Sequence, residues 1–269
     1  MASFSERNAG RTRRGAPLSP GPGGHGKPRF QAASGDWIWG VHAVEAALAN
    51  PLRPAPRRLL ATPDRARELE RRFGALKRLE VTDAVSLGRL LPAGAAHQGL
   101  ALEGPEPEPL DLEDFAPEPG AVLLMLDQVT DPGNVGAILR SAAAFGARGV
   151  ILQERRAPRL SGALAKAAAG AVDTLPVARA VNLSRALERL SDLGWRAVGL
   201  DGGASRDLSE VLDGAPVVLV LGSEGEGVRR LVAEHCDETA RIPMPGGFES
   251  LNVAAAAAVA LYEAARPRR

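Results

Sequence analysis

The chain has little of what marks a secreted, membrane-spanning or redox protein. It contains one cysteine, Cys236, so no disulfide bond can form within it. No apolar run is long enough to span a bilayer, and the N-terminus has no apolar segment of the signal-peptide kind. Aromatic residues make up only 4% of the chain. We therefore expect a cytoplasmic protein with no membrane partner and a core of Leu, Val and Ala.

An excess of charge of one sign is also absent, because the formal net charge is +1. The charge is unevenly distributed, however. The first 30 residues carry six basic side chains and one acidic one, a balance of +5 that leaves −4 on the rest. Residues 1–35 are rich in Gly, Pro, Ser and Arg, which predicts a disordered basic tail. Such a tail either binds phosphate groups or is only solvated, and the sequence favours neither.

Composition divides the rest of the chain at residues 104–120, where five prolines and several acids predict a stiff, hydrated linker. Residues 36–103 combine helical spacing with short apolar runs and predict a small α/β domain. Residues 121–269 alternate buried-strand runs with helical segments, which predicts a parallel sheet with helices on its faces. The expected strands of this second domain are 121–126, 149–152, 196–200 and 217–221, and the expected helices are 134–145, 160–169, 183–193, 227–235 and 250–265.

Three segments of the second domain each follow a strand, where open α/β sheets place their ligands. The first is Asp127–Arg140, in which Asn134 is the predicted N-cap of a helix. Arg140 falls opposite the apolar stripe of that helix, at about 100° per residue. It is therefore free to face a ligand or a partner chain, although an exposed helical arginine is more often only solvated.

The second segment, Leu221–Gly227, is a glycine-rich turn between a strand and a helix, which indicates nucleotide binding. Its order is not that of a dinucleotide-binding loop, and Glu224 and Glu226 would stand where a pyrophosphate needs neutral donors. An oxidoreductase with a nicotinamide cofactor is therefore disfavoured. A ligand without phosphates, or with a positive centre, fits better. The alternative is an ordinary turn that needs positive φ.

The third segment, Arg241–Val253, leads into an alanine-rich helix. Pro243 and Pro245 prevent regular strand or helix pairing, so the backbone must form a fixed loop here. Ser250 is placed to cap the last helix, beside free backbone amides. The small side chains at 254–258 either allow a close approach of another segment or reflect helix propensity alone.

Together these segments resemble the SpoU/TrmH branch of the SPOUT superfamily, a family of RNA ribose 2′-O-methyltransferases. That family has an Asn-x-Gly-x-x-x-Arg segment, a Gly-x-Glu-Gly turn and an Ile-Pro-Met…Ser-Leu-Asn-Val segment in this order, and all three are present. Gly40–Val44 and His97–Leu100 also resemble the family's small L30e-like substrate-binding domain. The arrangement is most similar to RlmB-type enzymes, which methylate a guanosine of 23S rRNA. One departure is Ala254, where family members often carry serine.

The resemblance implies a C-terminal trefoil knot, S-adenosylmethionine bound in the knot loops, a homodimer formed through the knot domain, and no metal. The cofactor contacts that it implies are Gly222, Ser223, Ile242, Met244 and Leu251. The polar active-site residues that it implies are Asn134, Arg140, Glu224, Ser250 and Asn252, with Arg140 acting across the dimer interface.

Several roles stay open at this point. Because a guanidinium has a pKa above about 12 and is a poor base, we expect Arg140 to clamp phosphate and to stabilise developing negative charge. Glu224 either orients Arg140 or takes the proton. The expected RNA is 23S rRNA, tRNA is the alternative, and a non-catalytic RNA-binding assembly factor is a third interpretation. His42 and His97 are expected to be structural or to face RNA.

Overall fold

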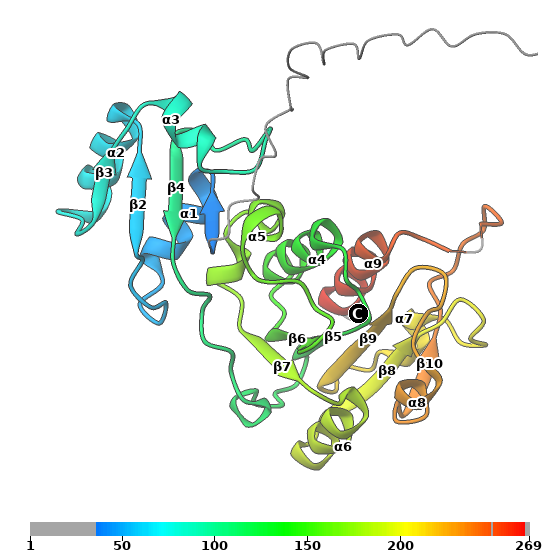
Figure 1. The fold of residues 1–269 in the computed structure, drawn as a ribbon. Coiled ribbons are helices and arrows are strands. Elements are labelled where there is room, and N and C mark those ends of the chain that lie inside the picture. The colour runs from blue at the N-terminus through cyan, green and yellow to red at the C-terminus, as the bar shows by residue number, and fades with distance from the viewer. Residues whose placement is uncertain (1–35, 249, 267–269) are drawn as a thin grey trace, which may run out of the picture. The chain divides into compact units, whose positions relative to one another are not determined.

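A computed structural model describes residues 36–248 and 250–266 (Figure 1). These residues belong to one compact unit. The basic tail expected at residues 1–35 lies outside the described residues. No helix in the described part of the chain is long and apolar enough to cross a membrane.

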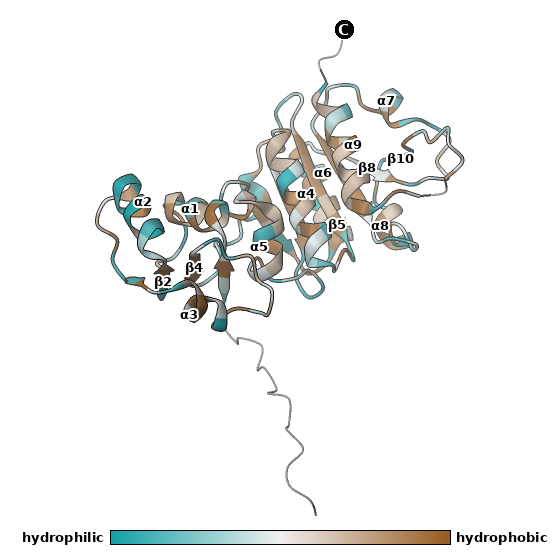
Figure 2. Cartoon of the chain, turned by 90° about the horizontal axis from the view of Figure 1, so that it is seen from above, coloured by the Kyte–Doolittle hydropathy of each residue, from teal (hydrophilic) through white to brown (hydrophobic). Residues whose placement is uncertain are grey.

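Residues 37–103 form a four-stranded sheet with three helices. The elements are β1 Trp37–Trp39, α1 Val41–Ala49, β2 Arg58–Ala61, α2 Pro63–Phe73, β3 Leu79–Val81, α3 Ala84–Arg89 and β4 Leu100–Glu103. The strand order is β1-β4-β2-β3, and only β2 and β3 pair in parallel. Side chains alternate between the two faces, so Ile38 joins the core with α1 and α2 while Trp37 and Trp39 join the core with α3. Figure 2 shows α2 as mostly hydrophilic, which fits a helix with one buried face.

Residues 112–265 contain a six-stranded sheet and its helices. The elements are η1 Leu112–Asp114, β5 Val122–Asp127, α4 Pro132–Ala144, β6 Gly149–Gln153, α5 Gly162–Ala168, η2 Ala171–Asp173, β7 Val177–Ala180, α6 Leu183–Leu193, β8 Arg196–Leu200, α7 Leu208–Val211, β9 Val217–Gly222, α8 Arg230–Ala233, β10 Glu238–Ala240 and α9 Val253–Ala265. The strand order is β10-β8-β9-β5-β6-β7, and all neighbours are parallel. This confirms the expected parallel α/β sheet and adds β7, β10 and α7, which the sequence did not indicate.

Helices cover both faces of this sheet (Figure 1). α4, α5 and α9 pack on one face around Ile138 and Leu139, whereas α6 and α8 pack on the other face against Met125. β5 lies between β9 and β6, and all six of its residues are buried. This position explains its uninterrupted apolar sequence.

The carboxyl ends of the parallel strands meet at one side of the sheet, here called the carboxyl edge. Asp127 at the end of β5 lies opposite Gly222 at the end of β9. Gln153 ends β6 and Leu200 ends β8 on either side of that pair. The loops that follow these four strands are therefore neighbours, where open α/β sheets bind their ligands.

Residues 104–120, expected to be a hydrated linker, pack against the second sheet along part of their length. Leu110 forms a bridge with β7, and Phe115 is buried. Glu106 forms an ion pair with Arg159. The apolar residues spaced among the prolines and acids give this segment a buried side. The domain boundaries drawn on either side of it stay predictions.

A buried ion pair joins the segment after α1 to η2. Nη1 of Arg53 donates to both carboxylate oxygens of Asp173 at 2.7 Å, and Asn50 donates to the same carboxylate at 3.2 Å. The two charged side chains are only 3% and 2% exposed. Nε and Nη2 of Arg53 have no hydrogen-bond partner among the described residues. Removal of one partner would therefore leave a poorly compensated buried charge.

We predict that Arg53→Met lowers the free energy of unfolding by about 3–5 kcal/mol, because it leaves Asp173 buried without its counter-ion. The double variant Arg53→Met/Asp173→Leu should lose less than Arg53→Met alone. Urea denaturation followed by circular dichroism measures both. Arg57→Met, which breaks an exposed ion pair with Asp36, is the control, with an expected loss of about 0–1 kcal/mol. Equal losses in Arg53→Met and the control would contradict the prediction.

Candidate functional site

The turn after β9 is a tight reversal at the carboxyl edge. The N–H of Gly227 donates to the backbone oxygen of Ser223 at 2.9 Å, so the chain reverses over residues 224–226. A Cβ atom at Gly222 would lie 1.8 Å from the backbone carbon of Gly227. Two backbone segments thus approach each other at Gly222 as only glycine allows.

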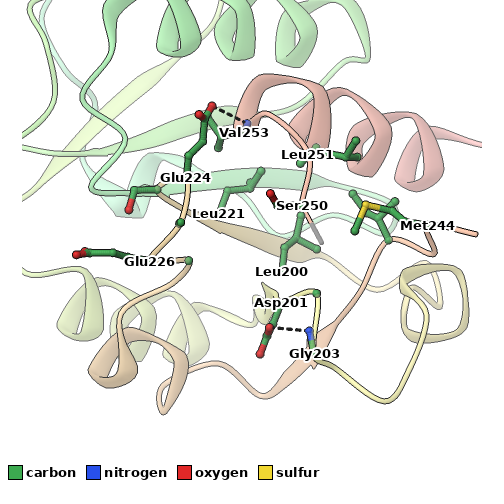
Figure 3. A pocket seen from close by; sticks show the side chains of 17 residues that line it. Leu200, Asp201, Gly203, Leu221, Glu224, Glu226, Met244, Ser250, Leu251 and Val253 are labelled. Atoms are coloured by element: carbon green, nitrogen blue, oxygen red, sulfur yellow. Dashed lines mark hydrogen bonds between the residues drawn. The ribbon is translucent and has the colours of Figure 1, made fainter. Parts of the chain in front are cut away.

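A cavity of about 460 Å³ opens beside this turn (Figure 3). This volume falls within the range of roughly 300–1,000 Å³ that is usual for ligand sites. Its walls come from the loops after β8 and β9, the segment after β10 and the start of α9. Glu224 and Ser250 line it, and so do all five residues expected to contact a cofactor. Those five are Gly222, Ser223, Ile242, Met244 and Leu251.

The charged side chains in the pocket wall are all acidic. They are Asp201, Glu224 and Glu226, and no lysine or arginine of the described chain is among the lining residues (Figure 3). Asp201 accepts a hydrogen bond from the N–H of Gly203 at 2.9 Å. An acidic lining opposes a phosphate-bearing ligand and favours one with a positive centre, as the glycine-rich turn predicted.

The β8 loop, residues 200–203, was missed as part of the site by the sequence reasoning. It lines the pocket across from Leu251 and Val253 at the start of α9 (Figure 3). The available signal was a strand followed by Asp-Gly-Gly, a turn sequence at the same edge of the sheet.

Three of the polar residues expected in the active site meet beside the pocket. Nδ2 of Asn252 donates to Oε1 of Glu224 at 2.6 Å and to Oδ1 of Asn134 at 3.0 Å. Asn134 donates to the same Glu224 oxygen at 3.3 Å, and so does the N–H of Val253 at 3.3 Å (Figure 3). Oε2 of Glu224 has no hydrogen bond within the described chain. This oxygen is left to accept one from a ligand.

The local roles of the two asparagines differ from those expected. Asp131 caps α4 by accepting from the N–H of Asn134 at 2.7 Å, so the prediction of Asn134 as the N-cap is wrong. Pro132, suited to the first helical position, was the signal for this earlier start. Asn252, and not Ser250, caps α9 by accepting from the first turn at 3.0 Å. Since Asp131 does the capping, the Asn134 side chain is free to reach Glu224.

Arg140 lies apart from this cluster. It is exposed on α4, as the helical spacing predicted, and it does not line the pocket. Phe145 is 37% exposed, because it follows the last turn of α4. It packs edge-on against Tyr262 of α9, with ring centroids 6.0 Å apart. The outer surface of α4 and α9 therefore combines an exposed cation with exposed aromatic rings.

Asp127 is a second position that the sequence reasoning missed. It is fully buried at the end of β5, where it accepts from the N–H of Arg229 at 2.9 Å and from its Nε at 2.8 Å. This ion pair holds the segment that follows the glycine-rich turn against the central strand β5. The sequence did contain a signal for Asp127, because it is a carboxylate at the end of an apolar strand. A charge buried there requires a partner of opposite sign.

Cys236 lies partly buried, close to two acidic residues. Burial raises the pKa of the Cys236 thiol to about 12, and the carboxylates of Asp237 and Asp127 add to the effect. The thiol is therefore uncharged near neutral pH and a weak nucleophile.

The described residues contain no cluster of His, Cys, Asp and Glu suited to a metal ion. Nδ1 of His97 accepts from the N–H of Gly99 at 3.1 Å, which is a structural contact.

The parallel sheet, with an acidic pocket and an amide–carboxylate cluster at its carboxyl edge, defines an α/β ligand-binding domain. Residues 121–262 match the model of the SpoU rRNA Methylase family, and the chain belongs to this family. It is similar to uncharacterized tRNA/rRNA methyltransferases of Mycobacterium avium and Mycolicibacterium smegmatis, with 46% identity over 178 residues in each case. Each match covers 64% of this chain and 57% of the relative, so the chain spans less than three fifths of the length of these relatives.

Solved structures of the same family are similar over most of the chain. The SpoU methyltransferase AviRb from Streptomyces viridochromogenes, in complex with AdoMet, has a TM-score of 0.73 and 28% identity and covers 85% of this chain and 88% of its own. An AdoMet-bound rRNA methyltransferase from Sinorhizobium meliloti has a TM-score of 0.69 and 29% identity, with 85% of each chain covered. A structure described as an RNA 2′-O ribose methyltransferase has a TM-score of 0.70 and 29% identity, covering 85% and 86%. This likeness confirms the SPOUT α/β fold, while the trefoil knot stays a prediction.

We predict that Gly222→Ala destabilises the protein by about 1–3 kcal/mol, because the new Cβ forces the turn after β9 apart. The thermal midpoint should fall by several degrees. Gly246→Ala is the control, since its Cβ would meet nothing within 4 Å. Differential scanning calorimetry of the two variants and the wild type gives the answer. An unchanged midpoint for Gly222→Ala would show that the turn is not as tight as described.

Proposed function

We propose that this chain transfers a methyl group from S-adenosylmethionine to a ribose 2′-hydroxyl of RNA, and that the RNA is 23S rRNA methylated at a guanosine. The observation that carries the proposal is the cluster of Asn134, Glu224 and Asn252 beside an acidic pocket. Family membership supports the reaction class, and so do the AdoMet-bound relatives.

S-adenosylmethionine fits the residues that line the pocket. Its sulfonium is cationic, and the wall offers three carboxylates with no lysine or arginine from the described chain. Gly222, Ile242 and Leu251 would hold it, through backbone groups and apolar contact. When bound, the cofactor supplies a methyl group that is already activated by the positive charge on sulfur.

The residues around Glu224 would position the ribose and receive its proton. Oε1 of Glu224 is occupied by Asn134 and Asn252, which leaves Oε2 to accept from the 2′-hydroxyl. No hydrogen bond joins Glu224 to Arg140 within the described chain. The free Oε2 is the basis for proposing Glu224 as the proton acceptor, and orientation of an Arg140 from a second copy of the chain is its alternative role. Ser250 in the pocket wall would add a further hydrogen bond, and alignment of this kind contributes on the order of 7–11 kcal/mol to catalysis.

In this proposal Arg140 acts on the site of a second copy of the chain. The apolar side chains exposed beside it on α4 and α9 are the kind that a homodimer covers. Phe145 is 37% exposed, Val259 42% and Tyr262 56%. From that surface the guanidinium would clamp an RNA phosphate and stabilise the charge that develops on the ribose oxygen.

tRNA is the second candidate substrate, because the curated relatives are described as tRNA/rRNA methyltransferases. rRNA is favoured by the description of the family and by the rRNA methyltransferase among the similar structures. The RNA-binding role of the four-stranded sheet domain and the cytoplasmic location stay predictions.

We expect the wild-type chain to transfer tritium from labelled S-adenosylmethionine to deproteinised 23S rRNA and not to bulk tRNA. Since a 2′-O-methyl group blocks alkaline cleavage, the label should be recovered at one alkali-resistant linkage next to a guanosine. Label in tRNA alone would move the function to the second candidate. Label in neither RNA, together with no binding of S-adenosylmethionine in calorimetry, would refute the proposal.

We predict that Arg140→Ala and Glu224→Ala are each inactive as pure proteins but regain activity when mixed and refolded together. In a mixed dimer one site would combine an intact Glu224 with an intact Arg140 from the partner, so about a quarter of wild-type activity should return. Recovery is measured by methyl transfer to the labelled RNA. No recovery would place Arg140 in the site of its own chain, and near-wild-type turnover by pure Arg140→Ala would remove it from the mechanism.

A further inference from the structure

Most arginines of the second sheet and its helices form an ion pair with an acidic side chain, and four exposed arginines do not. Within residues 121–266, four guanidinium groups have no hydrogen bond or ion pair to a described residue, and all four side chains are exposed. They are Arg140, Arg155, Arg156 and Arg185. Arg140 has a place in the proposed function, and the other three do not.

These three arginines follow two adjacent strands at the carboxyl edge. Arg155 and Arg156 lie in the turn directly after β6, and Arg185 lies in the first turn of α6, just after β7. The N–H of Glu154 donates to the oxygen of Ala180 at 3.0 Å, which joins the ends of the two strands. β6 is the neighbour of β5, whose following loop leads to Asn134. Since neighbouring strands lie roughly 5 Å apart, Arg155 and Arg156 begin one strand away from the polar cluster and Arg185 begins two strands away.

The turn after β6 is built to hold its side chains outward. The N–H groups of Arg156 and Ala157 both donate to the oxygen of Gln153, at 3.3 and 2.9 Å, so the backbone is closed on itself. Its acidic member, Glu154, is exposed and is not ion-paired with either arginine. The guanidinium groups are therefore positioned on the surface, and no acidic side chain among residues 36–248 and 250–266 neutralises them.

The same turn continues toward the four-stranded sheet. Arg159, three residues after the turn, forms ion pairs with Asp36, directly before β1, and with Glu106. Gly162 at the start of α5 lies against the ring of Trp39 in β1. An elongated anion that reached from the polar cluster to the four-stranded sheet would thus pass over Arg155 and Arg156.

We propose that Arg155, Arg156 and Arg185 bind the phosphate backbone of the substrate RNA beside the ribose that is methylated. This inference rests on the proposed function for its substrate. The acidic pocket repels phosphate, so the RNA strand has to leave the reacting ribose in another direction, and these unpaired cations offer the path along β6 and β7. Contacts to phosphate fix the position of the RNA and do not read its sequence.

The test compares two double variants that each remove two positive charges. Arg155→Gln/Arg156→Gln changes the proposed surface. Arg148→Gln/Arg189→Gln is the matched control: Arg148 precedes β6 at the opposite end of that strand, and Arg189 lies further along α6. For both, methyl transfer is measured against RNA concentration at several salt concentrations. Filter retention of deproteinised 23S rRNA is measured in parallel, because it does not depend on catalysis.

In the Arg155→Gln/Arg156→Gln variant we expect the apparent KM for RNA to rise about tenfold or more, with kcat at saturating RNA and the Kd for S-adenosylmethionine unchanged. The slope of log affinity against log salt should fall by about 1.5, or about 0.7–0.9 for each lost phosphate contact. The control should keep wild-type values. Equal behaviour of the two double variants, or a loss of kcat without a rise in KM, would overturn the inference.

The two proposals fail in different ways. A wild-type chain that retains 23S rRNA on filters but methylates no RNA and binds no S-adenosylmethionine would refute the proposed function, and the filter data would still decide whether the arginine surface binds RNA. A wild-type chain that methylates RNA while both double variants match it would refute only the arginine surface. A wild-type chain that retains no RNA would refute that surface as well.

Discussion

One carboxylate oxygen holds the candidate site together. Oε1 of Glu224 accepts hydrogen bonds from Asn134 in the first turn of α4, from Asn252, which caps α9, and from the backbone N–H of Val253. The parallel sheet brings the first two segments to one edge, and the tight turn at Gly222 aims the carboxylate at the third. Because Asp131 caps α4, the Asn134 amide remains available for this contact. The turn after β9 and the starts of α4 and α9 therefore meet at a single oxygen of Glu224.

Charge separates two neighbouring parts of the carboxyl edge. The wall of the pocket, along β8 and β9, is acidic, whereas the turns after β6 and β7 carry arginines that have no acidic partner in the described part of the chain. A cationic small molecule and a polyanion would each find one favourable surface and one unfavourable one. In the proposed reaction this separation keeps RNA phosphates out of the cofactor site and leaves only the ribose between the two surfaces.

Much of this arrangement could be predicted from the sequence, for identifiable reasons. β5 and β9 are buried on both faces and read as uninterrupted apolar runs, so both were found. β7 and β10 are short, and β10 contains the polar Glu238 and Thr239, so pairing with a neighbour and not their own composition makes them strands. The pocket residues after β9 and β10 follow from recognisable segments. The contribution of residues 200–203 depends on β8 lying next to β9, which no local pattern encodes.

The order of the segments along the chain has a consequence for biosynthesis. The pocket wall includes residues 242, 244, 250, 251, 253 and 256, which are translated after all six strands of the second sheet, while the strand that anchors its glycine turn is β5. Contacts between segments this far apart form late, because loop closure must come first. A nascent chain therefore has all six strands of the second sheet but no complete ligand site until the start of α9 has left the ribosome.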